Sequence, residues 1–237
     1  MKSINHILDA STPFEIVKYY LSSYSKLIDI YKFGWGSSLI DPEFEKKKDY
    51  CDKNDIIPVL GGTMFEYFYY KKKLITFKEY LKSHDLKWVE LSRGTIDISD
   101  EEYYELITEY SEDFNVMSEV GRKNDNNLPV LTSKEWLNQS LCSIKAGAKI
   151  VILESRESGK AGIANADGSL KKELLNDLLS ELDLNMILFE APTKQIQSYL
   201  INNYGSEVNL GNINLQNILP VHALRKKLRS DTLIGNE

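Results

Sequence analysis

Four glutamates each end a short hydrophobic run and are followed by small and charged residues: Glu90, Glu119, Glu154 and Glu190. A carboxylate just past a run of buried β-forming residues lies at the carboxyl end of a strand, where parallel α/β proteins bind their ligands. Hard cations such as Mg²⁺ take oxygen ligands. We therefore predict a ring of acids around one pocket, with Mg²⁺ held by Glu119, Glu154 and Glu190. The alternative for any one glutamate is a structural ion pair with a nearby arginine or lysine.

Cationic and polar side chains follow the same runs. Arginine binds phosphate or carboxylate through two parallel hydrogen bonds, and lysine acts as a point charge. In barrels the last strand–helix loops often bind phosphate, so asparagines after the eighth run are candidates too. Local ion pairing and an Asn-Gly turn remain alternatives. The candidate substrate-binding residues are Lys32, Ser92, Arg93, Arg156, Lys160, Asn209 and Asn212.

Eight apolar segments typical of strands alternate with amphipathic segments typical of helices. The predicted strands are 4–8, 27–33, 56–60, 87–91, 114–120, 149–154, 186–190 and 208–210. The predicted helices are 14–21, 76–83, 99–110, 132–147, 170–182 and 194–204, with one more beginning near residue 224. Repeated β-then-α units favour a parallel sheet with right-handed crossovers. We predict a single (β/α)₈ barrel domain over 1–237, with a short C-terminal tail from about residue 230, and a doubly wound open sheet as the alternative.

The composition argues against several classes of protein. A net charge of −6 over 237 residues disfavours a general nucleic-acid binder. No window approaches the roughly 18 apolar residues of a membrane span, and the first residues lack the apolar run of a signal peptide. Two cysteines and three scattered histidines give no zinc spacing. We expect a cytoplasmic protein that binds neither nucleic acid nor membrane. The sequence leaves homo-oligomerisation open.

The glycine-rich turns and the glutamates together resemble the phosphosulfolactate synthase family over nearly the whole chain. The segments that carry the resemblance are 32–38, 61–66, 89–96, 118–123, 154–160, 189–192, 208–213 and 224–232. The resemblance implies a (β/α)₈ barrel that uses Mg²⁺ to add sulfite to phosphoenolpyruvate, giving (2R)-phospho-3-sulfolactate. It further implies catalytic roles for Lys123, Glu119 and Arg156, with Lys123 as the general acid. Lys32 and Arg156 would hold phosphate or carboxylate.

The chain departs from the family pattern at three places near strand ends. Ala10 stands where the family has lysine, Arg93 where it has aspartate, and His222 where it has glutamate. The changes at Ala10 and Arg93 motivate a second hypothesis, a sibling enzyme that adds another small nucleophile to an enol phosphate or related phosphorylated acid. A third hypothesis is a non-catalytic barrel that binds a phosphorylated metabolite or a partner protein.

Overall fold

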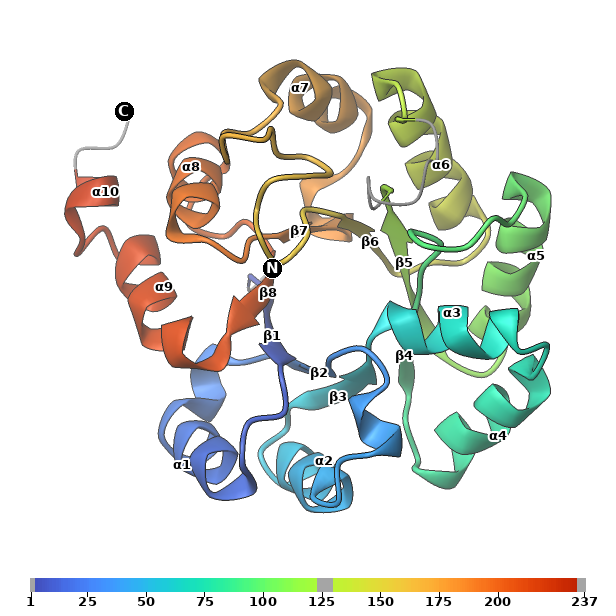
Figure 1. Cartoon of the computed structure of the whole chain (residues 1–237). Coiled ribbons are helices and arrows are strands. Elements are labelled where there is room, and N and C mark those ends of the chain that lie inside the picture. The colour runs from blue at the N-terminus through green and yellow to red at the C-terminus, as the bar shows by residue number, and fades with distance from the viewer. Residues whose placement is uncertain (1–2, 123–129, 234–237) are drawn as a thin grey trace.

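The computed structural model describes residues 3–122 and 130–233. Eight strands form a ring, and helices surround it (Figure 1). The strands are β1 (Asn5–Asp9), β2 (Ile30–Phe33), β3 (Ile57–Leu60), β4 (Trp88–Leu91), β5 (Asn115–Val120), β6 (Ile150–Leu153), β7 (Ile187–Glu190) and β8 (Leu210–Asn214).

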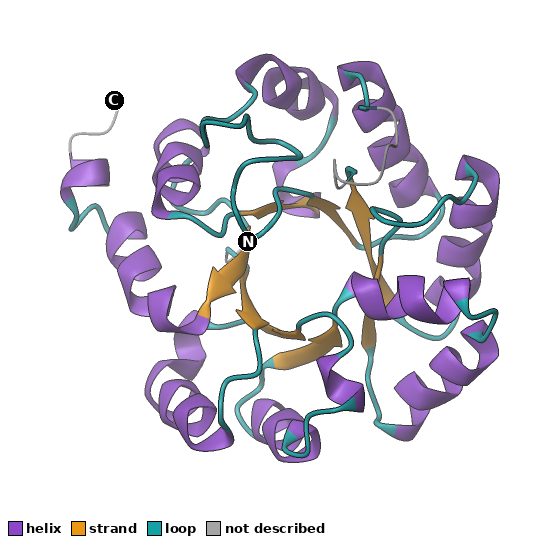
Figure 2. Ribbon diagram, viewed as in Figure 1, coloured by secondary structure: helices purple, strands orange, loops and turns teal. Residues whose placement is uncertain are grey.

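Every paired strand in the ring runs parallel to its neighbour. The hydrogen-bonded order is β3-β2-β1-β8-β7-β6-β5-β4, and β3 and β4 meet at the remaining seam. Because β1 pairs with β8, the sheet curls into a nearly closed barrel (Figure 2). The predicted (β/α)₈ barrel is confirmed, and the alternative of a doubly wound open sheet is wrong.

Helices cover the outside of the barrel between successive strands. The longer ones are α1 (Phe14–Tyr24), α2 (Phe44–Asp52), α3 (Gly62–Tyr70), α4 (Leu74–Ser83), α5 (Asp100–Ser111), α6 (Ser133–Lys145), α7 (Lys172–Glu181), α8 (Lys194–Tyr204) and α9 (Ile218–Arg225). Side chains cap the start of two of them: the Ser99 hydroxyl caps α5, and Thr132 and Glu135 form a capping box at α6.

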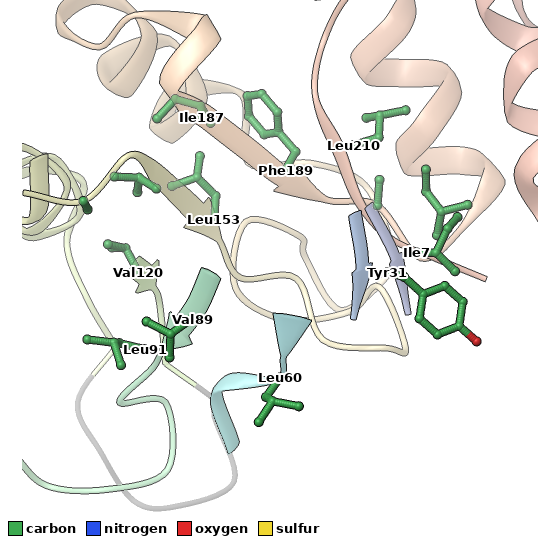
Figure 3. Packing of buried hydrophobic residues seen from close by; sticks show 14 of the residues in the cluster. Ile7, Tyr31, Leu60, Val89, Leu91, Val120, Leu153, Ile187, Phe189 and Leu210 are labelled. Atoms are coloured by element: carbon green, nitrogen blue, oxygen red, sulfur yellow. The ribbon is translucent and has the colours of Figure 1, made fainter. Parts of the chain in front are cut away.

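The strands separate two hydrophobic cores, since successive side chains point to opposite faces of a strand. One core lies between strands and helices, and Figure 3 shows part of it, including Tyr31, Leu153 and Phe189. The other fills the barrel and is formed by Ile30, Val59, Met117, Ile150, Ile152 and Leu188. Two residues further along β2, β4, β5, β6 and β7 the inward positions become charged. Strand alternation thus places a polar layer on top of the inner core.

The structure differs from the sequence interpretation in several elements. Helix α2 was not among the predicted helices, and the last helix begins at Ile218 and ends at Arg225 rather than beginning near residue 224. The Gly61-Gly62 segment begins helix α3 rather than forming only a turn. Strand β8 begins at Leu210 and extends to Asn214, later than predicted. The chain near residue 230 is not yet a tail, because Ser230–Leu233 forms the short helix α10, in which Thr232 is buried and donates a hydrogen bond to the Leu224 carbonyl. Within 3–122 and 130–233, no helix is long and apolar enough to cross a membrane.

Candidate active site

A cavity of about 470 Å³ opens at the carboxyl ends of the strands. Each of the eight strands contributes one lining residue near or just beyond its carboxyl end: Leu8, Lys32, Gly61, Glu90, Glu119, Glu154, Glu190 and Asn212. Loop residues complete the wall: Trp35, Gly62, Thr63, Thr95, Arg156, Glu157 and Ser158. The cavity therefore occupies the position predicted for the ligand site.

Three of the predicted glutamates converge in this cavity. Glu119, Glu154 and Glu190 are buried, and each offers a carboxylate oxygen within 4.8 Å of the other two. Two of them are oriented by the backbone: Glu190 Oε2 accepts a hydrogen bond from the Ser155 N–H at 3.0 Å, and Glu154 Oε1 accepts one from the Arg156 N–H at 2.6 Å. Buried carboxylates this close repel one another unless protons or a cation offset their charge. Their oxygen donors fit a hard divalent cation such as Mg²⁺.

Lys32 lies beside the acid trio and contacts two glutamates. Its Nζ is 3.0 Å from Glu90 Oε1 and 3.7 Å from Glu190 Oε1. Burial alone would lower the pKa of Lys32, but the surrounding carboxylates raise it above its ordinary value. The carboxylates around Lys32 therefore favour its charged ammonium form. The contact is the ion pairing with glutamates that was kept as the alternative to anion binding, although the sequence did not show that Lys32 would pair with Glu90 and Glu190.

Glu90 differs from the trio in its partners. Its Oε1 accepts hydrogen bonds from Lys32 Nζ and from the Gly62 N–H at 2.7 Å, while its Oε2 is buried and has no hydrogen-bond partner in the described part of the chain. Burial raises the pKa of Glu90, and the lysine only partly counteracts this. Gly62 permits the close approach, because a Cβ there would lie 2.6 Å from Ser92 Cβ.

The loop after β6 covers one side of the mouth. Gly162 must be glycine, since its φ is +63° and a Cβ would lie 1.8 Å from the Glu154 carbonyl oxygen. Arg156, at φ 44°, lines the cavity, whereas Lys160 is exposed and does not line it. Trp35 reaches this loop from the β2 side, where its indole N–H donates to Glu157 Oε1 at 3.0 Å. The sequence offered no signal for this contact between residues so far apart along the chain.

Two predicted substrate ligands after β4 lie outside the cavity wall. Ser92 donates to Glu66 Oε1 at 2.7 Å, and Glu66 also accepts from the Thr95 N–H and hydroxyl, which docks this loop on α3. Arg93 pairs with Asp100, and its guanidinium lies 4.6 Å from the Tyr103 ring centre. The structure brings neither Ser92 nor Arg93 to the cavity, because both side chains are engaged with neighbouring helices.

The two candidate asparagines lie at opposite ends of the barrel. Asn209 precedes β8, accepts a hydrogen bond from the Ile4 N–H and donates to the Ile187 carbonyl, so it is placed at the amino ends of the strands, away from the cavity. Asn212 lies within β8, lines the cavity and donates from Nδ2 to Glu190 Oε1. Lys123, the predicted general acid, lies outside the described residues.

Fold and cavity define a (β/α)₈ barrel with a candidate ligand site at the carboxyl ends of its strands, and comparisons of the sequence identify the family. The family model for (2R)-phospho-3-sulfolactate synthase (ComA) matches residues 1–231. The phosphosulfolactate synthase of Bacillus subtilis (strain 168) is 36% identical over 227 residues, covering 95% of this chain and 90% of the relative. That of Methanocaldococcus jannaschii is 37% identical over 235 residues, covering 98% and 94%. The chain belongs to the phosphosulfolactate synthase family and is an enzyme.

Solved structures support the fold alone. A 3-keto-L-gulonate-6-phosphate decarboxylase from Vibrio cholerae aligns with a TM-score of 0.59 at 10% identity, over 97% of this chain and all of that one. A phosphonopyruvate hydrolase aligns with a TM-score of 0.57 at 13% identity, over 95% and 81%. These identities are too low to carry functional residues across.

Proposed function

We propose that this enzyme is a Mg²⁺-dependent phosphosulfolactate synthase, which adds sulfite to phosphoenolpyruvate to give (2R)-phospho-3-sulfolactate. Family membership supports the reaction. The proposed Mg²⁺ site is supported by the buried cluster of Glu119, Glu154 and Glu190, which each offer a carboxylate oxygen within 4.8 Å of the other two.

The charges around the cavity explain why a cation is needed. Five glutamates and only two cationic side chains, Lys32 and Arg156, line it among the described residues. A phosphorylated carboxylic acid and sulfite are both anions, and such a wall alone would repel them. When bound by the trio, Mg²⁺ would offset this charge and act as a Lewis acid toward substrate oxygens.

The proposed reaction forms one bond and moves one proton. The sulfur lone pair of sulfite attacks C3 of phosphoenolpyruvate, and the electrons of the C2–C3 double bond move onto C2 and the carboxylate, giving an aci-carboxylate. A proton then adds to C2 from one face. Fixed positive charge next to the developing carboxylate charge lowers the barrier most, because it needs no reorganisation during the reaction.

The cavity residues have separable roles in this proposal. Lys32, held protonated between Glu90 and Glu190, supplies fixed positive charge rather than a mobile proton, since its raised pKa makes it a weak acid. Arg156 is the candidate for binding phosphate or carboxylate through two hydrogen bonds. Lys123 remains the predicted proton donor.

The position of Arg93 weakens the hypothesis that this enzyme adds a nucleophile other than sulfite. That hypothesis was motivated in part by Arg93, but Arg93 pairs with Asp100 and does not line the cavity. We therefore keep sulfite as the proposed nucleophile. We also propose that the reaction takes place in the cytoplasm, where the free thiols of Cys51 and Cys142 would stay reduced.

Phosphorus NMR tests the proposal directly. Purified enzyme with phosphoenolpyruvate, sulfite and Mg²⁺ should form a new phosphoester, and omission of sulfite or addition of EDTA should abolish it. Glu154→Gln keeps the side-chain volume but removes one carboxylate, so the rate should fall at least about 100-fold. No new phosphoester from folded wild-type protein, or the same rate in EDTA, would contradict the proposal.

A further inference from the structure

We propose that His6 is a positioning residue that orients the Glu190 carboxylate through Asn212. The inference rests on the proposed function in one respect, namely that Glu190 serves as a cation ligand. His6 lies on β1, its side chain is buried within the barrel, and it does not line the cavity.

The pairing of β1 with β8 is irregular. Asn5 pairs with Leu210, but Ile7 pairs with Ile213, so β8 contains one more residue than β1 over this stretch. An extra residue of this kind leaves a backbone N–H without its ladder partner and re-aims a side chain. Here that N–H belongs to Asn212, whose φ of 50° lies in the left-handed region that asparagine tolerates better than most residues.

His6 supplies the missing partner. Its Nδ1 accepts a hydrogen bond from the Asn212 N–H at 3.2 Å. A ring nitrogen that accepts must be unprotonated, so a neutral imidazole here carries its proton on Nε2. Burial and the nearby charge of Lys32 lower the pKa of His6 well below its ordinary value, which keeps the ring neutral and Nδ1 available. Without this acceptor the Asn212 N–H would be buried and unsatisfied.

The fixed backbone of Asn212 in turn fixes its amide. Nδ2 donates to Glu190 Oε1, while the Ser155 N–H donates to Glu190 Oε2, so both carboxylate oxygens are held. A carboxylate accepts hydrogen bonds only, which identifies the amide nitrogen of Asn212 as the atom facing it. Asn212 Oδ1 is left buried without a hydrogen-bond partner among the described residues, on a side chain that lines the cavity. Outer groups that orient ligands in this way typically change metal affinity 10–100-fold when removed.

Two substitutions of His6 separate the hydrogen bond from the packing. His6→Asn keeps an acceptor close to the position of Nδ1, whereas His6→Leu fills the space without one. With Mn²⁺ as the probe cation and isothermal titration calorimetry as the readout, His6→Leu should weaken binding about 10–100-fold. His6→Asn should stay much closer to wild type. Val59→Ala removes volume from the inner core at a side chain that cannot form hydrogen bonds, so it controls for general loss of stability.

The Mn²⁺ affinities of the two His6 variants can contradict the positioning role. Equal Mn²⁺ affinity in His6→Leu and wild type, or equal losses in His6→Asn and His6→Leu, would overturn it. If His6→Leu does not fold, Asn212→Gly is the second variant, because glycine tolerates the left-handed backbone and the substitution removes only the side-chain amide. Asn212→Gly should weaken Mn²⁺ binding by the same factor as expected for His6→Leu. Unchanged Mn²⁺ affinity in Asn212→Gly would overturn the inference.

The cation site and the positioning role can fail separately. If wild type and Glu154→Gln bind Mn²⁺ equally, or neither binds it, the proposed cation site fails. A crystal structure of His6→Leu, or of Asn212→Gly, then decides the positioning role by itself: a displaced Glu190 carboxylate supports it, and an unmoved one overturns it.

Discussion

Lys32 and Lys47 are both almost fully buried, and each contacts two carboxylates, yet they lie in different parts of the barrel. Lys32 points into the cavity between Glu90 and Glu190. Lys47 comes from α2, and its Nζ lies 3.1 Å from Asp9 and 2.6 Å from Asp41. It does not line the cavity.

The two clusters differ in whether the carboxylate oxygens that do not contact the lysine accept other hydrogen bonds. Asp9 Oδ1 accepts from the Thr12 N–H at 2.7 Å, and Asp41 Oδ1 accepts from the Glu43 N–H at 2.9 Å, so this cluster is satisfied by its own neighbourhood. Around Lys32 the second oxygen of Glu90 has no hydrogen-bond partner in the described chain. A buried charge cluster that closes on itself is structural, whereas one left incomplete next to a cavity is suited to a ligand.

The largest effect should come from removing the cavity lysine. Lys32→Met should lower kcat/KM for phosphoester formation by about 100- to 1,000-fold, because a fixed charge next to the reacting carboxylate is lost. The measurement is the steady-state rate of the folded variant, with Lys32→Arg as the control that keeps the charge. If Lys32→Met turned over as fast as wild type, the two lysines would be equivalent and the comparison would fail.

The matching change in the other cluster should act on stability instead. Lys47→Met leaves the buried Asp9 and the partly buried Asp41 without their cation, which should lower the free energy of unfolding by about 3–5 kcal/mol. Urea denaturation measures this loss, and kcat/KM of the folded protein should stay near wild type. Combining Lys47→Met with Asp9→Asn and Asp41→Asn should recover part of the stability. A loss of activity as large as that of Lys32→Met would contradict a purely structural role.

A smaller effect should appear in the pH dependence of the same variant. Burial works against ionisation of Asp41, but its hydrogen bonds with Lys47 and Glu43 leave its pKa below the ordinary value. A depressed carboxyl pKa contributes stability above the unfolded-state pKa, and this contribution is lost as pH falls through the folded-state pKa. The stability gap between wild type and Lys47→Met should therefore narrow below about pH 4, as urea midpoints at decreasing pH would show. A constant gap down to the acid transition would exclude the Asp41 contact as its source.

Much of the site could be predicted because strand alternation is a local property. Glu119 and Glu190 each lie two residues beyond an inward-facing apolar residue of the same strand, so a period of two places them inside the barrel mouth. Residues just past a strand are harder to place. Ser92 and Arg93 follow β4 directly, but their side chains bind Glu66 on α3 and Asp100 on α5 rather than facing the cavity.

The boundaries of the eighth predicted strand were wrong by two residues at its start and four at its end, and this had a larger consequence. The sequence interpretation grouped Asn209 and Asn212 as one candidate phosphate-binding segment. In the structure β8 spans Leu210–Asn214, so Asn209 precedes the strand and lies away from the cavity, whereas Asn212 lies within the strand and lines the cavity. Hydrophobic patterns locate strands well but locate their ends poorly, since the ladder that ends a strand is formed with distant neighbours.

The sequence by itself determined the barrel, the family and the end of the barrel that carries the acids, because these follow from local alternation and from motifs in order along the chain. Only the tertiary structure decided which charges meet. Lys32 reaches Glu90 from 58 residues away, and His6 reaches Asn212 from 206 residues away. Such contacts depend on how strands are ordered and on a single irregularity between β1 and β8, and neither is encoded in any local pattern.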